Sequence, residues 1–129
     1  MSAREAIGLD SHKAAAAPYS PILRYGELLF VSGQVAIGPD GTLVEGGIAE
    51  QTEQVLTNLA VALEQAGSGL DRLLKCNVFL ADLGDWAAMN EVWIRRIGLP
   101  RPARCAVGAS LPDGMLLEVD AIAATGDSA

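Results

Sequence analysis

Residues 115–124, with the sequence MLLEVDAIAA, constrain the fold most strongly, because apolar side chains occupy both alternating sets of positions. Leu117 and Val119 belong to one set, and Leu116 and Ile122 belong to the other. In a β-strand these two sets point to opposite faces of the sheet. A strand with two apolar faces is typical of a sheet that sees little water on either side. We therefore expect a sheet of which both faces are covered.

Two helices are predicted to cover one face of that sheet. Apolar residues recur at helical spacing between residues 48 and 66, acidic residues lie in the first turn, and Gly67 follows as a stop signal. A second helix is expected to begin after Asp85 as its N-cap and to run to about Ile97. The arginines near the C-terminal end of this segment, and the glycine and proline that follow, agree with that end point.

The remaining apolar segments are predicted strands. A turn at residues 25–27 is expected to close a hairpin that leads into a strand near 28–37. Apolar and polar residues alternate in 73–82, which predicts another strand with one face made by Leu74, Cys76, Val78 and Leu80. The last two strands, 103–109 and 115–124, are joined by the turn sequence SLPDG, and we expect them to pair with each other as a hairpin.

This order of elements indicates an α+β sandwich, in which a mixed sheet carries two helices packed on one face. A chain of 129 residues fits one domain. We place that domain at residues 16–125, with a loose arm at 1–15 and a tail at 126–129. No segment remains to cover the second face of the sheet. We therefore expect a second subunit to cover it, in agreement with a hydrophobic content of 50%.

Composition narrows the classes of function. Sixteen acidic residues against nine basic ones give a net charge of −7, which repels the phosphate backbone of nucleic acids, and the basic residues are not clustered in the sequence. The two cysteines lack the spacing of a zinc site or a C-x-x-C motif. No stretch has the length and hydrophobicity of a secretory leader or a membrane span. These features predict a cytoplasmic protein that binds neither membranes nor nucleic acids.

Three charged residues interrupt the last two predicted strands: Arg104, Glu118 and Asp120. If the predicted hairpin closes about Pro112, all three lie on one face, with Arg104 opposite Asp120. A structural ion pair at a strand end is the simplest interpretation. However, apolar neighbours place the arginine where its charge is costly to bury without an anion. Because guanidinium geometry fits a carboxylate, we expect a small carboxylic acid as ligand and a second acid that is free to orient water or carry a proton.

Several longer stretches resemble the RidA (YjgF) family of reactive-intermediate deaminases. They are APYSP, FVSGQ, the run from EQTEQ to NEVW at residues 50–93, PARCAV, and LPDGMLLEVDAIA. The resemblance covers residues 16–123, roughly the whole predicted domain. Each motif is ordinary by itself, but their joint order over nearly the whole chain is specific to the family.

The resemblance implies a chorismate-mutase-like α+β fold and a homotrimer with three sites in the clefts between subunits. The implied reaction is the hydrolysis of enamine or imine intermediates, such as 2-aminoacrylate, to a 2-keto acid and ammonia. It needs no metal and no organic cofactor. The implied partner is therefore a small imine substrate that carries a carboxylate.

The resemblance also implies roles for single residues. Arg104 matches the family's substrate-binding arginine, and Glu118 matches its site glutamate, so both are expected to be catalytic. Arg104 would clamp the substrate carboxylate, while Glu118 holds the water that attacks the imine carbon. The other expected substrate-binding residues match the P-Y-S motif, the S-G-Q motif and the asparagine of the second helix; they are Tyr19, Ser32, Gly33 and Asn90.

The chain departs from the family pattern at several positions. Many relatives carry a cysteine two residues after the arginine, where this chain has Ala106. Cys105 follows the arginine directly and is expected to point to the opposite face of the sheet. Pro21, the short link at 98–102 and Gly108 also differ from most relatives. These differences leave the preferred imine open.

Other functions stay open from the residues alone. The trimer could bind small acids as a metabolite sensor or chaperone-like partner, without turnover. A chorismate-mutase-like isomerase would need a second cation for a dicarboxylate, for which Arg24 and Arg101 are available. A nuclease is disfavoured by the acidic net charge of −7 and by the absence of a basic and aromatic stripe in the sequence.

Structural interpretations of the same residues also stay open. Taken alone, Tyr19 fits a core aromatic residue, and Asn90 fits a polar group on a helix face. Trp86, Asn90 and Trp93 share one helical stripe, and for the tryptophans this pattern favours core or interface packing.

Overall fold

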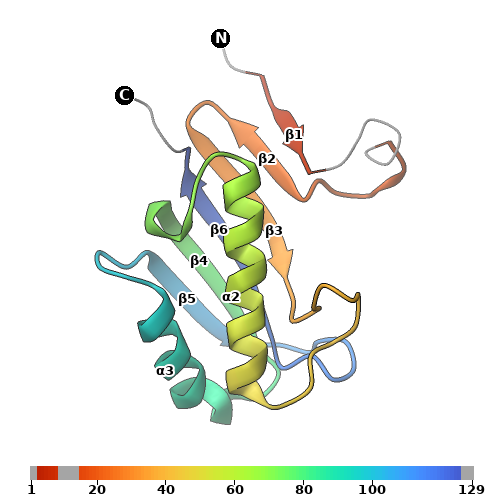
Figure 1. The fold of residues 1–129 in the computed structure, drawn as a ribbon, viewed down its shortest axis with the longest axis vertical. Coiled ribbons are helices and arrows are strands. Elements are labelled where there is room, and N and C mark those ends of the chain that lie inside the picture. The colour runs from red at the N-terminus through yellow and green to blue at the C-terminus, as the bar shows by residue number, and fades with distance from the viewer. Residues whose placement is uncertain (1–2, 9–14, 126–129) are drawn as a thin grey trace.

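A six-stranded sheet forms the frame of the protein in a computed structural model, which describes residues 3–8 and 15–125 (Figure 1). The strand order is β1-β2-β3-β6-β4-β5. All neighbouring strands run antiparallel except β4 and β5, which are parallel. The structure thus confirms the predicted mixed sheet. The strands are β1 (Glu5–Ile7), β2 (Ile22–Tyr25), β3 (Leu28–Gln34), β4 (Leu73–Leu80), β5 (Ala103–Gly108) and β6 (Leu117–Ala124).

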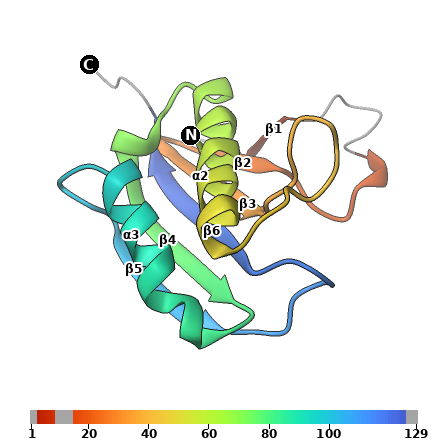
Figure 2. The ribbon, with the colours of Figure 1, turned by 60° about the horizontal axis from the view of Figure 1, so that its bottom comes forward.

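Both helices lie on the same face of the sheet, as Figures 1 and 2 show from two directions. They are α2 (Ile48–Gln65) and α3 (Trp86–Arg96), and short 3-10 turns, η1 (Leu70–Arg72) and η2 (Leu83–Asp85), precede β4 and α3. Both predicted helices are confirmed to within one residue at each end. Gly67 follows the first helix with a φ of 80°, a left-handed conformation that glycine adopts without steric cost.

The connections explain why the helices share a face. The helix α3 joins the parallel strands β4 and β5, and α2 joins β3 to β4, which both pair antiparallel to β6. Each helix therefore forms a crossover between parallel strands, and such crossovers share one hand, so both helices pack on the same side.

The hydrophobic core lies between these helices and the sheet. Its fully buried side chains come from every layer, and each of the following exposes 1% or less: Leu56, Leu59 and Leu63 of α2, Val92 of α3, Val78 and Leu80 of β4, and Leu117 and Val119 of β6. Burial of one such side chain contributes about 1.5–3 kcal/mol, so this layer carries much of the stability.

The other face of the sheet, which we call the open face, carries no helix in the described chain (Figure 2). Phe30 and Val107 lie on it and are 40% and 43% exposed. Ile122 also lies on the open face and is partly buried, whereas the residues on either side of it in β6 are buried in the core. The prediction that β6 presents apolar groups to both faces is confirmed, and one of those faces is uncovered in the single chain.

The predicted hairpin between residues 103–109 and 115–124 is wrong. The strand β4 lies between β5 and β6 and pairs with both. Arg104 is opposite Cys76 in β4, while Asp120 is opposite Asn77. The parallel crossover through α3 dictates this order, and the loop before β6 needs to span only two strand spacings, about 10 Å.

Two further local predictions need correction. Leu74 is 47% exposed, and Leu73 is buried instead, because an irregularity in the pairing with β6 between Leu73 and Lys75 shifts the alternation. Within the segment predicted as a loose arm, residues 5–7 form β1 and pair with β2. The predicted tail, residues 126–129, lies outside the described residues.

Candidate functional site

Arg104 lies on the helix side of β5, which is an edge strand of the sheet. Its guanidinium carbon Cζ is 5.0 Å from the centre of the Trp93 ring and 5.8 Å from that of Trp86. The Nη1 atom donates to the sulfur of Met89 at 3.8 Å. Both ring distances lie within the range of about 6 Å for cation–π attraction. We call these four residues the arginine cluster.

The charge of Arg104 has no counter-ion among the described residues. The ion pairs of the described residues are Arg95–Glu53 and Arg96–Glu53, and neither involves Arg104. Burial lowers the pKa of the Arg104 guanidinium, since the apolar surroundings disfavour the charged form. The cluster thus holds a partly desolvated cation, which attracts an anion from outside.

Some donors of the Arg104 guanidinium remain available to such an anion. The guanidinium has five N–H donors, and the one hydrogen bond found for this side chain among the described residues is that to Met89. No fully buried side-chain nitrogen or oxygen in the described chain lacks a hydrogen-bond partner, so the unpaired nitrogens of Arg104 reach solvent. A carboxylate can therefore approach the free N–H groups of the guanidinium, which lies over the faces of the two rings.

Asn90 lies on the same stripe of α3 as the two tryptophans, four residues after Trp86 and three before Trp93. It is half-buried, and its side chain makes no hydrogen bond to another described residue. The amide is therefore free to bind a ligand beside the arginine cluster. This placement agrees with the expected substrate-binding role but does not test it.

Glu118 lies on the open face, where it packs against Gly33 of β3. A side-chain carbon at Gly33 would overlap Oε2 of Glu118 and come within 2.8 Å of its Cδ. The pairing of β3 with β6 is irregular here, because Ser32 and Gly33 together face Asp120 alone. The bulge and the absent side chain make room for the Glu118 carboxylate.

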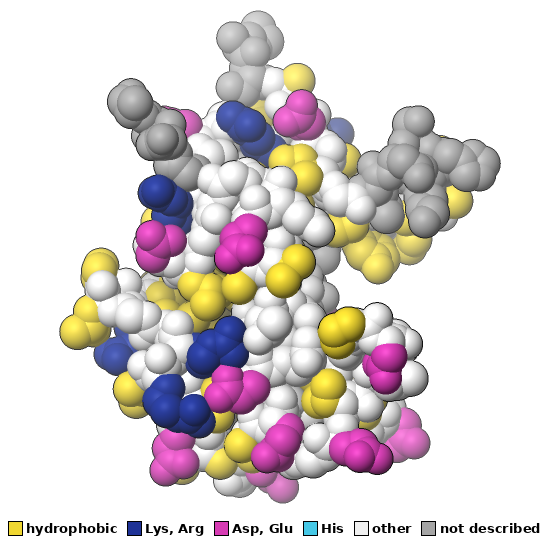
Figure 3. Space-filling view, in the orientation of Figure 1, with side chains coloured by type: hydrophobic (Ala, Val, Ile, Leu, Met, Phe, Trp, Pro, Cys, Tyr) yellow, Lys and Arg dark blue, Asp and Glu magenta, His cyan; other side chains and the backbone are white. Residues whose placement is uncertain are grey.

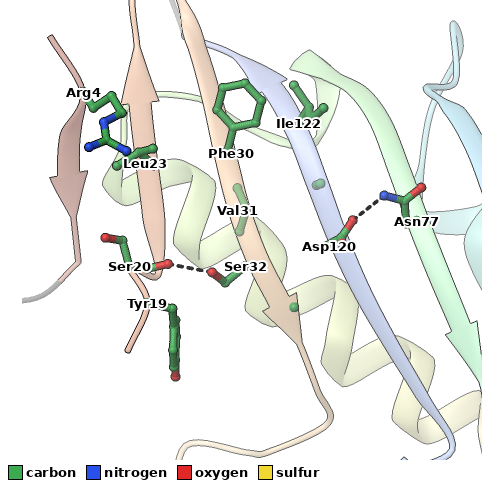
Figure 4. A pocket seen from close by; sticks show the side chains of 12 residues that line it. Arg4, Tyr19, Ser20, Leu23, Phe30, Val31, Ser32, Asn77, Asp120 and Ile122 are labelled. Atoms are coloured by element: carbon green, nitrogen blue, oxygen red, sulfur yellow. Dashed lines mark hydrogen bonds between the residues drawn. The ribbon is translucent and has the colours of Figure 1, made fainter. Parts of the chain in front are cut away.

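A hollow of about 500 Å³ on the open face is lined by Gly33, the residue against which this carboxylate packs (Figure 4). We call it the sheet hollow; its polar lining comes from Arg4, Tyr19, Ser20, Ser32, Asn77 and Asp120, next to Gly33 and apolar residues such as Phe30. Tyr19 is 63% exposed, so it is not a core aromatic residue in the single chain. Tyr19 and Arg4 stand at opposite ends of the hollow (Figure 4).

Hydrogen bonds fix the walls of the sheet hollow. The Ser32 hydroxyl donates to the carbonyl oxygen of Ser20 at 2.6 Å, and the Ser32 amide donates to that of Pro21 at 2.9 Å. These bonds hold the segment next to Tyr19 against β3. The amide of Asn77 donates to Oδ1 of Asp120 at 2.9 Å (Figure 4).

The structure corrects the predicted grouping of the charged residues. Arg104 shares the helix side of the sheet with Cys76, whereas Glu118 and Asp120 lie on the open face. The partner of Asp120 is Asn77, so Asp120 does not face the arginine. One chain therefore brings Tyr19, Ser32, Gly33 and Glu118 together. It places Asn90 on the helix stripe of the two tryptophans that contact Arg104, but it does not bring these two groups together.

Sequence reasoning missed several residues of these two groups. The predicted packing of the tryptophans is confirmed for Trp93, which is 3% exposed in the core, whereas Trp86 is 40% exposed. The contact of both rings with a cation was not predicted, and their spacing with Asn90 on one helical stripe is the signal that could have indicated it. Met89 and Arg4 gave no signal in the sequence. Cys105 is exposed and lies on the face opposite Arg104, as predicted.

The remaining ionisable groups give no metal or thiol site. Among the described residues, no three His, Cys, Asp or Glu side chains lie close enough to hold a metal ion. Burial raises the pKa of the Cys76 thiol to about 12, so this cysteine stays protonated and is a poor nucleophile at neutral pH.

Comparisons with known proteins decide the family. A model of the family described as "Endoribonuclease L-PSP" matches residues 10–125. The chain is 44% identical over 119 residues to protein HMF1 of Saccharomyces cerevisiae, with 92% of each chain covered. It is 42% identical over 110 residues to the mitochondrial protein MMF1 of the same yeast, covering 84% of this chain and 76% of MMF1. The crystal structure of a Rid family protein from Yersinia pestis superposes with a TM-score of 0.85 at 35% identity, covering 95% of this chain and all of that one.

The chain belongs to the RidA (YjgF) family, also described as the L-PSP family. The predicted fold is therefore confirmed by relatives as well as by the sheet and helices. No helix in the described part of the chain is long and apolar enough to cross a membrane. A cytoplasmic location stays a prediction, since several of the relatives are mitochondrial.

Proposed function

We propose that this RidA family member hydrolyses 2-imino acids, formed from enamines such as 2-aminoacrylate, to 2-keto acids and ammonia. The observation that carries the proposal is Arg104, a partly buried cation with free donors and no counter-ion among the described residues. Such a group fits the carboxylate of a 2-imino acid. The carboxylate of Glu118 beside an open hollow supplies the second function that hydrolysis needs, a base for water.

The chemistry follows from these two groups. Arg104 binds the substrate carboxylate and fixes the position of the imine carbon. Glu118 accepts a proton from water, whose oxygen forms a bond to the imine carbon, and the nitrogen takes up a proton from solvent to give a tetrahedral carbinolamine. Glu118 then returns its proton to that nitrogen, and the carbon–nitrogen bond breaks as the hydroxyl group releases its proton to solvent and becomes the carbonyl group. The 2-keto acid and ammonia leave, and Glu118 is a carboxylate again. Acid–base help of this kind contributes on the order of 10²–10⁴ in rate.

The two groups act together only if separate copies of the chain supply them. Arg104 and Glu118 lie on opposite faces of the sheet, two strands apart. The open face also exposes apolar side chains, among them Phe30, Leu28 and Val107. We propose a homotrimer that buries the open face and brings Arg104 of one copy to the sheet hollow of the next. A head-to-tail interface of this kind closes into a ring when its rotation is one third of a turn, roughly 120°.

The test is the rate of keto-acid release when 2-aminoacrylate and 2-iminobutyrate are generated in situ. We expect the wild-type protein to accelerate release, and Arg104→Ala and Glu118→Gln to abolish most of the acceleration. Arg72→Ala and Glu45→Gln are matched controls, since both residues are exposed and lie outside the two groups. Sedimentation of the same samples reports whether the protein is a trimer.

Two other outcomes would lead to different conclusions. A folded trimer that does not accelerate release, yet binds a 2-keto acid through Arg104, would support the sensor or chaperone-like alternative. Cleavage of RNA would support the activity that the family description names. We disfavour that activity because the net charge is −7, and because acidic and basic side chains are interspersed on the face in Figure 3.

A further inference from the structure

The chain contains two tryptophans, and both contact the guanidinium of Arg104. We infer that Trp86 and Trp93 are positioning residues: they hold the Arg104 guanidinium over the faces of their rings, in place of an internal carboxylate, so that most of its N–H donors stay free for the carboxylate of the substrate. The inference rests on the proposed function for the identity of the substrate. The inference goes beyond the proposed function because it assigns a role in substrate binding to two residues of α3.

The two rings stand where a structural arginine usually has a carboxylate partner. An arginine held by a protein carboxylate presents its donors to that carboxylate, and an incoming anion must compete for them. The aromatic rings attract the cation through their faces without accepting its in-plane N–H groups. The sulfur of Met89, a weak acceptor, takes one donor at 3.8 Å. The cluster therefore orients the side chain and leaves strong acceptors to the ligand.

The two rings differ in burial and therefore in role. Trp93 is 3% exposed and forms part of the core, so its position is fixed by packing. Trp86 is 40% exposed at the first residue of α3, and its ring extends from the core layer toward solvent. A ligand on the free edge of Arg104 is therefore expected to lie near Trp86, whereas Trp93 supports the guanidinium from inside.

The experiment uses equilibrium binding, because binding does not depend on catalysis. Pyruvate is the probe, since it is the 2-keto acid that 2-aminoacrylate yields and it is chemically stable. We expect pyruvate to change the intrinsic tryptophan fluorescence of the wild-type protein, with saturation, and to leave that of Arg104→Ala unchanged. In Trp93→Phe, Trp86 is the single tryptophan and is expected to keep the larger part of the signal.

Substitutions of Trp86 test positioning against mere packing. We expect Trp86→Leu to raise KM for the imine and Kd for pyruvate about fivefold, the effect of losing one cation–π contact, with little change in kcat. Trp86→Phe keeps an aromatic face and should restore most of the affinity. Ile94→Ala is the matched control, because Ile94 is an exposed apolar residue of the same helix, 57% exposed. Thermal unfolding of each variant shows whether the fold is intact.

The outcomes separate this inference from the proposed function. If pyruvate binds through Arg104 and Trp86 but no imine is hydrolysed, the inference stands and the deaminase proposal fails. If Arg104 is needed for hydrolysis but folded Trp86→Leu has wild-type KM and Kd, the inference is overturned while the deaminase proposal stands. A Trp86→Phe variant as weak as Trp86→Leu would likewise overturn it, because then the aromatic face is not what matters.

Discussion

Two arginine sites border the helix α3, and they differ in whether a described acidic side chain pairs with the arginine. On the side toward α2, Arg96 pairs with Glu53 at 2.6 Å and also donates to Thr57, and Arg95 joins the same carboxylate at 3.1 Å. On the side toward β5, Arg104 meets two aromatic rings and a thioether. The described part of the chain supplies an acid where the arginine links two helices, and it supplies none where the arginine borders an open site.

This difference separates a structural arginine from one that is available to a ligand. Residue type does not distinguish Arg96 from Arg104; the surroundings of the two side chains do. An arginine with a strong acceptor inside the protein has used its best hydrogen bonds. An arginine that is held over aromatic rings keeps its N–H donors available to a ligand, at the cost of partial desolvation of its charge. The predictions below test that contrast and the proposal that a second copy of the chain completes the Arg104 site.

The largest effect is expected when two inactive variants are mixed. Arg104→Ala and Glu118→Gln each remove one group of the proposed site, so each alone should have little activity. If neighbouring copies supply the two groups, unfolding and refolding of an equal mixture restores an intact pair at about a quarter of the interfaces. Keto-acid release by the mixture should therefore approach a quarter of the wild-type rate.

The same mixture distinguishes an intermolecular site from an intramolecular one. A site within one chain would give no recovery, because every chain in the mixture lacks one of the two groups. Each variant refolded alone is the control for recovery during refolding. Sedimentation of the mixture confirms that oligomers have formed again.

The next effect comes from giving Arg104 the acid that Arg96 already has. Met89 is fully buried and contacts the guanidinium, so a carboxylate at this position would pair with it. We expect Met89→Glu to raise KM for the imine on the order of 10²-fold, since the substrate then competes for charged hydrogen bonds worth about 1.5–3 kcal/mol each. Steady-state kinetics measure this.

Met89→Gln is the matched control, with the same size and no charge. It should raise KM much less than Met89→Glu if neutralisation of Arg104 is the cause. Equal KM values for the two variants, in proteins that unfold at similar temperatures, would contradict the contrast between Arg104 and Arg96.

A smaller loss is expected from filling the space that Glu118 uses. A methyl group at Gly33 would overlap the Glu118 carboxylate and displace it. We expect Gly33→Ala to lower kcat about tenfold or more, within the range of general-base catalysis, and to affect KM less. Gly98→Ala is the matched control, because a side-chain carbon there meets no atom within 4 Å. A wild-type kcat for Gly33→Ala would show that the position of Glu118 does not matter.

The helices and most strands could be predicted from the sequence because their signals are local. Gly67 ends α2, and apolar spacing fixed both helices to within a residue. The position of Arg104 could not be predicted from the turn SLPDG, because a short loop does not reveal whether a third strand lies between its ends. The order strand, helix, strand from β4 to β5 is the signal that favours parallel pairing, and it places Arg104 opposite Cys76.

The candidate site was predicted only in part, because its geometry depends on contacts between segments that are distant in the sequence. Family resemblance named Arg104 and Glu118, but their relation depends on which face each side chain takes, and that follows from the strand pairing. Contacts such as Arg104 with Trp86 join segments that are far apart in the sequence and carry no local pattern. Asn77, the partner of Asp120, was predicted as a strand residue without a role for the same reason.

The smallest effect concerns stability rather than activity. The hydrogen bond from Arg96 lowers the pKa of Glu53 from its ordinary value of 4.5. Because the pKa of Glu53 in the folded state lies below its value of 4.5 in the unfolded state, the pair stabilises the protein at a pH well above 4.5. That stabilisation is lost progressively as the pH falls from 4.5 through the lower folded-state pKa. We expect Glu53→Gln to lower the free energy of unfolding by about 0.2–1 kcal/mol at pH 7, as for exposed pairs.

Urea unfolding at one fixed protein concentration, at pH 7 and at pH 3.5, measures this difference, since oligomers unfold in a concentration-dependent way. The gap between wild type and Glu53→Gln should be present at pH 7 and should shrink at pH 3.5. Activity at pH 7 should be unchanged, because Glu53 lies in neither group of the proposed site. A gap of equal size at both pH values would mean that Arg96 does not depend on the charge of Glu53. The contrast with Arg104 would then rest on packing alone.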